Sequence, residues 1–392
     1  MSTLNTPSTP STEVLLSVRD LRISFGTVEA VRGLSLDVHR GEVLAVVGES
    51  GAGKSLTARA LLGMPPRGAS VTGSVRLGAD ELVDAPHSVR SALWGRRVAL
   101  VPQDALSSLS PVHQVADQLA AAVRSVDGVS RKEARARAVA ALEEVGIAPD
   151  KARAYPHEFS GGMRQRAVIA MAMLHQPDLV IADEPTTAQD PETQKQVLDL
   201  LARRTGAAGA ALVLVTHDLA AVREHSDRML VMYAGRLVEA GPVEEVFAGP
   251  RAPYTAGLLA SVPVDGGAPE KSAPGAPRKG RGAVTDAAPP RWGSPRASSI
   301  RAWGSDQPQR TRSFSTAKPA ERIRRLPAIA GAPPAPTDLP TGCAFEPRCP
   351  LADATRCRTE QPEPETQDGR TVACHRWREL PDNPAELFLE SV

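Results

Sequence analysis

Short apolar runs recur between Val14 and Glu239, and polar or glycine-containing segments separate them. The run Val43–Val47 is apolar throughout, which is typical of a strand buried on both faces. Similar runs predict strands at Val71–Leu77, Val98–Val101, Leu179–Ala182, Ala211–Val215, Met229–Tyr233 and Arg236–Glu239. Helical patterns and cap signals predict helices at Lys54–Leu62, Pro111–Ser125, Arg131–Val145, Gly162–His175 and Glu192–Arg203. This alternation indicates an α/β fold with a parallel sheet and a ligand site at the carboxyl ends of its strands.

Three consecutive predicted helices, between about residues 105 and 176, interrupt the alternation of strands and helices. They lie between two strands of the predicted core, so we expect them to form a helical subdomain. Ser130 and Glu133 predict a capping box at the start of the second helix, and Gly146 predicts its end.

A glycine-rich segment follows Val43–Val47 directly. Gly48–Ser55 fits the pattern G-x-x-x-x-G-K-[ST] of a phosphate-binding loop. Its glycines let backbone N–H groups point at phosphate oxygens, Lys54 places positive charge beside the β- and γ-phosphates, and the Ser55 hydroxyl can ligate Mg²⁺. The alternative is a glycine-rich turn that only joins a strand to a helix. The residues expected to contact nucleotide are Gly48, Ser50, Gly51, Ala52, Gly53, Lys54, Ser55 and Leu56.

Polar residues end other predicted strands. Asp183 and Glu184 follow one apolar run, and Gln103 and His217 follow two more. Asp183 can hold Mg²⁺, and Glu184 can orient or deprotonate an attacking water. Gln103 could ligate Mg²⁺ and sense the γ-phosphate, and His217 could hydrogen-bond that phosphate. Each of these residues alone could be an ordinary strand-end residue, but together they predict a site for Mg²⁺ and a nucleoside triphosphate.

Composition argues against several functional classes. The chain has 392 residues and a formal net charge of +1, and aromatic residues make up only 3% of it, which argues against a nucleic-acid-binding protein. No apolar run approaches the roughly 20 residues that span a bilayer. The N-terminus is polar and lacks the apolar region of a signal peptide, so we expect the chain to stay in the cytosol.

Two segments have compositions that predict disorder. Residues 1–12 are rich in Ser, Thr and Pro, and residues 264–322 are basic and rich in Pro, Ala, Ser and Arg. The second segment could contact anionic lipid or RNA, but we interpret it as a solvated linker.

The motifs together resemble those of ATP-binding-cassette (ABC) transporter ATPases, and within them the ATP-binding subunits of oligopeptide, dipeptide and nickel importers. The order of motifs agrees throughout: GESGAGKS, VPQD, FSGGMRQR, IADEPTTAQD, VTHDL, VMYAGRLVEAGPVEEVF and APYTAGLLASVP. The resemblance covers roughly Val14–Pro263 and resumes at Arg325–Arg376. It implies a nucleotide-binding domain at 13–263, with an antiparallel β subdomain beside the parallel core, and a small irregular cysteine-containing extension at 323–392.

The resemblance also assigns roles to residues. Phe25 resembles the aromatic residue that stacks on adenine, although its spacing alone favours a half-buried strand residue. Gln103 resembles the glutamine of the Q-loop, which faces the membrane subunits, and Asp190 the D-loop aspartate, beside a Gln189 where the family usually has leucine. Asp183 and Glu184 resemble the Walker B pair, with Glu184 as catalytic base, and His217 resembles the switch histidine. The resemblance also identifies the signature motif, Ser160, Gly161, Gly162 and Gln165, which in the family contacts ATP held by the opposite subunit.

These assignments imply an ATPase subunit that uses ATP and Mg²⁺ to drive import of di- or oligopeptides. Partners implied are a second, related ATPase subunit in a heterodimer, two membrane permease subunits and an extracellular solute-binding protein, with the chain on the cytoplasmic face of the membrane. Nickel or another small solute is an alternative cargo. Two other classes remain open: a soluble ABC ATPase acting on nucleic acid or ribosomes, and an interaction module whose cysteines sense redox state or iron.

The four cysteines all lie in the C-terminal extension: Cys343, Cys349, Cys357 and Cys374. Their spacing differs from the paired C-x₂-C of zinc ribbons. Four thiolates match the needs of a 4Fe–4S cluster, which some relatives carry in this extension. Zinc and unligated thiols are the alternatives.

Overall fold

The computed structural model describes residues 13–187, 189–261 and 329–388. The predicted N-terminal segment 1–12 and linker 264–322 lie outside the described residues, as do Ala188 and the first residues of the predicted extension. The described residues all belong to one compact unit. The predicted domain boundaries therefore stay predictions.

The core of this unit is a mixed sheet. Its strands are β3 (Val43–Val47), β6 (Val98–Val101), β7 (Leu179–Asp183), β8 (Ala211–Val215), β9 (Arg228–Tyr233), β10 (Arg236–Pro242), β11 (Glu365–Gln367) and β12 (Arg370–Val372). The strand order is β11-β12-β10-β9-β3-β8-β7-β6. The pairs within β9-β3-β8-β7-β6 are parallel, and their central strands are almost wholly buried, which confirms the predicted parallel core.

A second sheet of antiparallel strands covers one face of the core. It has the order β2-β1-β4-β5 and consists of β1 (Val14–Phe25), β2 (Val28–His39), β4 (Ser70–Leu77) and β5 (Asp80–Glu81). Its inward side chains, such as Leu16 and Leu34, share one hydrophobic core with Leu44 of β3 and with Ile181 of β7. The β subdomain expected from the family resemblance is therefore present.

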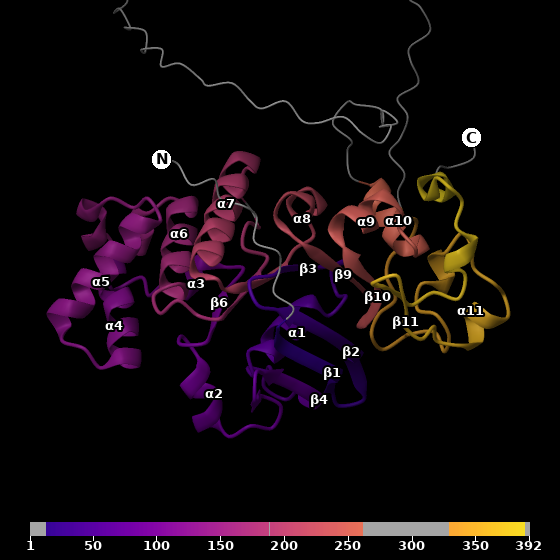
Figure 1. Cartoon of the computed structure of the whole chain (residues 1–392), viewed down its shortest axis with the longest axis horizontal. Coiled ribbons are helices and arrows are strands. Elements are labelled where there is room, and N and C mark those ends of the chain that lie inside the picture. The colour runs from indigo at the N-terminus through magenta and orange to yellow at the C-terminus, as the bar shows by residue number, and fades with distance from the viewer. Residues whose placement is uncertain (1–12, 188, 262–328, 389–392) are drawn as a thin grey trace, which may run out of the picture. The chain divides into compact units, whose positions relative to one another are not determined.

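Helices cover the other face of the core sheet. The helical subdomain contains α3 (Ala105–Ser108), α4 (Val115–Asp127), α5 (Arg131–Glu144) and α6 (Gly161–Ala172) (Figure 1). Leu119, Leu142 and Ile169 share a hydrophobic core with Leu214 of β8, whose neighbours Val213 and Val215 belong to the opposite core. This alternation of side chains along β8 explains how one strand supports two cores.

Further helices surround the sheet. They are α1 (Lys54–Leu61), α2 (His87–Leu93), α7 (Pro191–Ala208), α8 (Leu219–His225), α9 (Val243–Ala248), α10 (Pro253–Ala260) and α11 (Arg356–Thr359). Short 3₁₀ helices lie at η1 (Pro149–Arg153), η2 (Pro156–Glu158), η3 (Glu346–Arg348), η4 (Trp377–Glu379) and η5 (Pro384–Phe388). None of the described helices is both long and apolar enough to cross a bilayer.

The sequence predictions for individual helices are accurate except at their ends. Ser130 caps α5 by accepting a hydrogen bond from the Glu133 N–H at 3.3 Å, which is one of the two bonds of the predicted capping box. The predicted helix Pro111–Ser125 begins later, at Val115, because the Gln118 side chain binds both backbone groups of Ser110 and holds the preceding residues in a loop. The sequence did not predict α2, α8, α9 or α10.

The C-terminal extension continues the core sheet. Glu239 and Ala240 of β10 pair antiparallel with Val372 and Thr371 of β12. Figure 1 shows the extension in yellow beside β10, α9 and α10. Most of the described extension is irregular, as predicted, but its strands β11 and β12 join the sheet, a pairing over more than 100 residues that local patterns do not predict.

Candidate nucleotide site

The loop after β3 has a backbone that only glycine fits. Gly48 has φ 151°, and a Cβ there would lie 2.2 Å from the backbone oxygen of Met232. Gly53 has φ 95°, and its Cβ would lie 3.0 Å from the backbone oxygen of Ala30. The loop is therefore pressed between β9 and β2, and the glycines at both of its ends are required for this close approach.

Lys54 is buried beneath this loop, with 5% of its surface exposed. Its Nζ donates to the carbonyl oxygens of Gly48 at 2.8 Å and of Glu49 at 3.1 Å, and it lies 4.0 Å from Oε1 of Glu184. Burial lowers the pKa of Lys54, and the nearby carboxylates oppose that shift. The structure therefore holds a cation under the loop, at the place predicted for contact with phosphate.

Ser55 and Asp183 meet across the site. The Ser55 hydroxyl donates to Oδ1 of Asp183 at 2.9 Å. Burial raises the pKa of Asp183, and the hydrogen bond from Ser55 opposes this shift. A hydroxyl and a carboxylate oxygen at this separation provide the hard donors that Mg²⁺ prefers.

Glu184 is the residue around which the other predicted groups gather. Its carboxylate accepts from Gln103 Nε2 at 3.2 Å and from Thr187 Oγ1 at 3.0 Å, and lies 3.5 Å from Nδ1 of His217. Glu184 itself has φ 45°, a left-handed conformation that is uncommon outside glycine and is often found at functional sites. The sequence predicted the meeting of Gln103, Glu184 and His217, but it did not single out Thr187.

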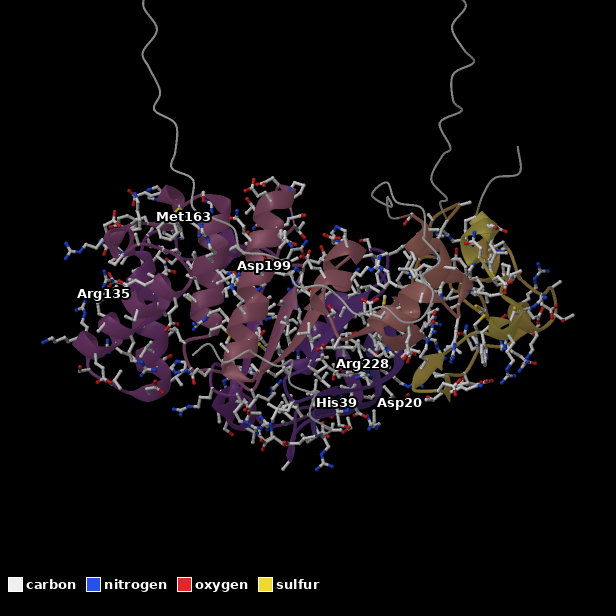
Figure 2. The ribbon with its side chains drawn as sticks, turned by 45° about the horizontal axis from the view of Figure 1, so that its top comes forward. Asp20, His39, Arg135, Met163, Asp199 and Arg228 are labelled. Atoms are coloured by element: carbon white, nitrogen blue, oxygen red, sulfur yellow. The ribbon has the colours of Figure 1, made fainter. Side chains whose placement is uncertain are left out.

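The residues predicted to face a partner subunit lie on two neighbouring helices. Ser160 caps α6, and Asp190 caps α7 by accepting from Thr193 N at 3.0 Å. A Cβ on Gly162 would lie 3.0 Å from Thr193 Cγ2, so the two helix starts are close. In Figure 2, Met163 and Asp199 mark these helices.

Two predicted nucleotide contacts differ in exposure. Phe25 is 36% exposed at the end of β1, and Ser160 and Gly161 are also exposed, so these residues are open to a ligand. Gln165 is 1% exposed, and its Nε2 is buried with no hydrogen-bond partner among the described residues. Gln165 is therefore covered by other residues in this conformation, and its predicted contact with ATP stays a prediction.

The four cysteines line one cavity of about 50 Å³, large enough for more than one water molecule. Burial raises the pKa of three of these residues, Cys343, Cys349 and Cys374, to about 11 for Cys349 and about 12 for Cys374. No three of their sulfur atoms lie within 4.8 Å of one another. All four residues that the sequence singled out as metal ligands nevertheless line the same cavity.

Two arginines of the cassette line the same cavity. Arg32 is 9% exposed, and its Nη2 is buried with no partner among the described residues, as is Nε of Arg236. Burial and the nearby Arg236 both lower the pKa of Arg32. Neither arginine was predicted to matter, because each lies far from the cysteines in the sequence.

Two family models match the chain. A model of the ABC transporter family matches residues 31–187. A model of the oligopeptide/dipeptide transporter C-terminal region matches residues 238–285 and 311–357.

Several relatives are similar over most of the chain. The chain is 42% identical over 356 residues to the oligopeptide transport ATP-binding protein OppD of Mycobacterium bovis, which covers 89% of this chain and 49% of that protein. It is 44% identical over 260 residues to the dipeptide transport ATP-binding protein DppD of Bacillus subtilis, over 64% of this chain and 77% of that protein. It is 37% identical over 382 residues to the probable peptide ABC transporter ATP-binding protein y4tR of Sinorhizobium fredii, over 95% of this chain and 98% of that protein. The chain thus spans about half the length of the OppD relative.

Solved structures share the fold. The ATP-binding cassette MJ0796, a dimer in a post-hydrolysis state with ADP and phosphate, has a TM-score of 0.52 at 23% identity, over 58% of this chain and 98% of that one. The cbiO1 protein of Clostridium perfringens has a TM-score of 0.54 at 26% identity, over 60% of this chain and 91% of that one. These likenesses confirm the cassette fold predicted from the sequence.

Proposed function

The chain belongs to the ABC transporter family as an ATP-binding protein of its oligopeptide/dipeptide group, and on that premise we propose that it hydrolyses ATP to drive import of di- or oligopeptides. The observation that carries this proposal is the convergence of Gln103, Glu184 and His217 on one edge of the sheet, beside Lys54. These groups come from the ends of three different strands, and phosphoryl transfer to water needs each of them at that place.

The chemistry assigned to these residues is in-line attack of water on the γ-phosphorus. Glu184 orients the water and accepts its proton as the new P–O bond forms and the bond to the β-phosphate oxygen breaks. Lys54 stabilises the charge on the transferring group, and His217 donates a hydrogen bond to it. Phe25 offers its exposed ring to adenine, and the loop residues Ser50–Leu56 cradle the phosphates.

Ser55, Asp183 and Gln103 fit a magnesium site, since the first two already join hard oxygen donors by a hydrogen bond of 2.9 Å. When bound there, Mg²⁺ neutralises charge on the β- and γ-phosphates. The raised pKa of Asp183 fits a carboxylate that awaits a cation.

The substitution Glu184→Gln tests this assignment. It preserves the shape of the side chain but removes the base, so ATP binding should persist while turnover falls by about 100-fold or more. Glu143→Gln, at an exposed position on α5, is the matched control and should hydrolyse ATP at the rate of the unaltered chain. Unchanged turnover in the Glu184 variant would remove Glu184 from the base role.

A complete ATP site requires a second cassette. Ser160, Gly161 and Gly162 start a helix whose free N–H groups suit a phosphate. In this proposal they meet ATP held by a partner subunit, with Gln165 and Asp190 supporting that surface. We expect a heterodimer with a related ATPase. Sedimentation of the Glu184→Gln chain with ATP, alone and with its co-expressed partner, separates a heterodimer from a homodimer.

We further propose that the dimer docks on two permease subunits at the cytoplasmic face of the membrane and receives cargo from an extracellular solute-binding protein. The matches to peptide transporter families support peptide as cargo, and nickel or another small solute is the alternative. Uptake of labelled dipeptides, oligopeptides and Ni²⁺ into vesicles that carry the whole complex distinguishes these cargoes. Gln103 is the residue through which nucleotide state would reach the permeases.

We assign a 4Fe–4S cluster to Cys343, Cys349, Cys357 and Cys374. Tetrahedral zinc would hold thiolate sulfurs about 3.8 Å apart, whereas no three of these sulfurs lie within 4.8 Å of one another. A 4Fe–4S cluster would hold its four thiolates further apart than zinc does, and its negative charge would suit the nitrogens of Arg32 and Arg236 that have no partner in the described part of the chain. The cluster would hold the extension in shape.

Anaerobic purification tests the cluster. A brown protein with broad visible absorbance and about four iron atoms per chain is the expected result. Cys374→Ser should lose that absorbance, and an exposed-site variant such as Glu143→Gln should retain it. Four free thiols and no iron in the anaerobic protein would exclude the cluster.

A further inference from the structure

One arginine of the extension reaches the phosphate-binding loop. Arg348 lies between Cys343 and Cys349, and its side chain is only 7% exposed. Its Nη1 and Nη2 donate to the two carboxylate oxygens of Glu49 at 2.7 and 3.0 Å. Glu49 is the second residue of the loop Gly48–Ser55, so a residue of the extension touches the loop predicted to hold ATP.

The guanidinium of Arg348 has all five of its N–H donors engaged. Besides Glu49, Nη1 donates to the Tyr233 hydroxyl at 3.1 Å, Nη2 to the Gly331 carbonyl at 3.2 Å and Nε to the Ala330 carbonyl at 2.9 Å. Arginine has five such donors in a rigid fork. A fully used fork fixes the position of every group that it contacts.

Glu49 is held from three directions. Its backbone N–H donates to the Tyr254 hydroxyl at 2.9 Å, its carbonyl accepts from Lys54 at 3.1 Å, and its carboxylate is paired with Arg348. The rings of Tyr233, Tyr254 and Phe345 pack together beside these contacts, with centroids 4.6 to 5.4 Å apart. The conformation at the start of the loop therefore depends on side chains from β9, α10 and the extension.

Charge gives this contact a second consequence. An unpaired carboxylate on the loop would repel the phosphates of ATP. It would also offset part of the positive charge of Lys54, whose pKa the Glu49 carboxylate acts to raise. Pairing with Arg348 offsets the charge of Glu49. The extension thus shapes the loop and removes a repulsive charge from it.

We propose that Arg348 is a positioning residue that braces the phosphate-binding loop through Glu49, so that the C-terminal extension sets the affinity of the cassette for ATP. This inference rests on the proposed function as an ATPase. The brace acts on bound phosphates in both ground and transition states, so its loss should raise the KM for ATP and leave kcat nearly unchanged.

The chain offers a matched control. Arg370, also in the extension, pairs with the buried Glu239 on β10 and donates to the backbone of Glu245 and Gly249. Its contacts hold the extension on the sheet edge and do not include the loop. Arg348→Lys and Arg370→Lys both keep a positive charge and lose the fork, but only the first acts on Glu49.

The experiment compares the full chain and these variants by titration with a fluorescent ATP analogue and by steady-state ATP hydrolysis. Arg348→Lys should bind nucleotide about tenfold more weakly, the loss of one charge-assisted contact. Glu49→Gln should lose less affinity, because it removes the repulsive carboxylate together with the brace. The kcat should stay within about twofold in both variants. Arg370→Lys should bind nucleotide as the unaltered chain does, although its melting temperature falls. The exchanged pair Glu49→Arg with Arg348→Glu should recover part of the affinity lost by Arg348→Glu alone.

Equal losses of affinity in Arg348→Lys and Arg370→Lys would overturn the proposed role of Arg348. They would show that ATP affinity depends only on the attachment of the extension to the sheet edge. Unchanged affinity in both Arg348→Lys and Glu49→Gln would also overturn it, and the second variant decides if the first does not fold. An unaltered chain that binds no nucleotide would instead refute the proposed function, which keeps the two failures distinct.

Discussion

The nucleotide site and the cysteine cavity are built in different ways. At the nucleotide site the polar groups satisfy one another, with Ser55 on Asp183 and Gln103 on Glu184. In the cavity, burial raises the pKa of Cys349 and Cys374, and the nitrogens of Arg32 and Arg236 lack partners within the described residues. The first site is organised before its ligand arrives, whereas the second contains groups whose burial is unfavourable until something binds.

The two regions meet at Arg348, which contacts the loop and precedes a cysteine. A substitution inside either region should therefore change the ligand binding of that region alone. Only a substitution at this junction should change both.

The largest difference in effect between the nucleotide site and the cysteine cavity is expected from Lys54→Met. Loss of the buried cation should lower affinity for ATP by about a thousandfold, since it removes charge-assisted contacts with two phosphates. The iron content of the chain should not change. Lys151→Met, at an exposed position on η1, serves as control in the same nucleotide titration. Tight ATP binding by the Lys54 variant would contradict the site.

Gly48→Ala should destabilise the phosphate-binding loop Gly48–Ser55. Its Cβ would lie 2.2 Å from a backbone oxygen of β9, so the free energy of unfolding should fall by about 2 kcal/mol or more. Gly51→Ala has φ 82° and nothing within 4 Å of its Cβ, and should cost only about 1 kcal/mol. Urea denaturation compares the two variants, and equal losses would show that the close approach to β9 is unimportant.

The burial of Cys374 in the cavity should make the stability of the chain depend on pH. In the metal-free chain, burial raises the pKa of Cys374 to about 12, above that of an unfolded cysteine. The contribution of the protonated Cys374 thiol to the free energy of unfolding is complete below about pH 8.5. It is lost as the pH rises toward 12, because the unfolded chain releases the proton first. Between pH 8 and 10 the unaltered chain should lose about 2 kcal/mol more stability than Cys374→Ser. Parallel pH profiles for the two proteins would disprove this environment.

The smallest effect is expected at Arg236. Removal of a cation beside the proposed cluster, which carries negative charge, would disfavour its reduced form, so Arg236→Gln should lower the reduction potential of the anaerobic protein. Arg378→Gln, which alters a mostly exposed arginine, should leave it unchanged. A redox titration followed by visible absorbance measures both, and equal potentials in all three proteins would place Arg236 outside the influence of the cluster.

The sequence predicted the nucleotide edge well because its residues follow short apolar runs. Asp183, Glu184 and His217 end parallel strands, and the carboxyl ends of such strands necessarily meet. Thr187 carried no such signal, since its bond to Glu184 depends on the left-handed turn at that residue.

The surroundings of the cysteines were not predictable in the same way. The sequence identified the four thiols by residue type, but Arg32 approaches them from β2 and Arg236 from the start of β10. Likewise, the pair of Arg348 with Glu49 joins residues 299 positions apart. Tertiary packing alone brings these charges together, and no local pattern of hydrophobic and polar positions encodes it.

The pairing of β12 with β10 has a consequence for the birth of the protein on the ribosome. Arg370 and Glu239, the ion pair beside this pairing, are 131 residues apart, so β10 emerges long before its neighbour exists. Until then β10 presents an open strand edge, which is a template for pairing with other chains. Each doubling of the intervening length adds only about 0.6 kcal/mol to the entropy cost of closing this loop. The late synthesis of β12 therefore exposes the β10 edge to other chains but costs the folded protein little stability. A chaperone that covers β10 during synthesis would protect the nascent chain.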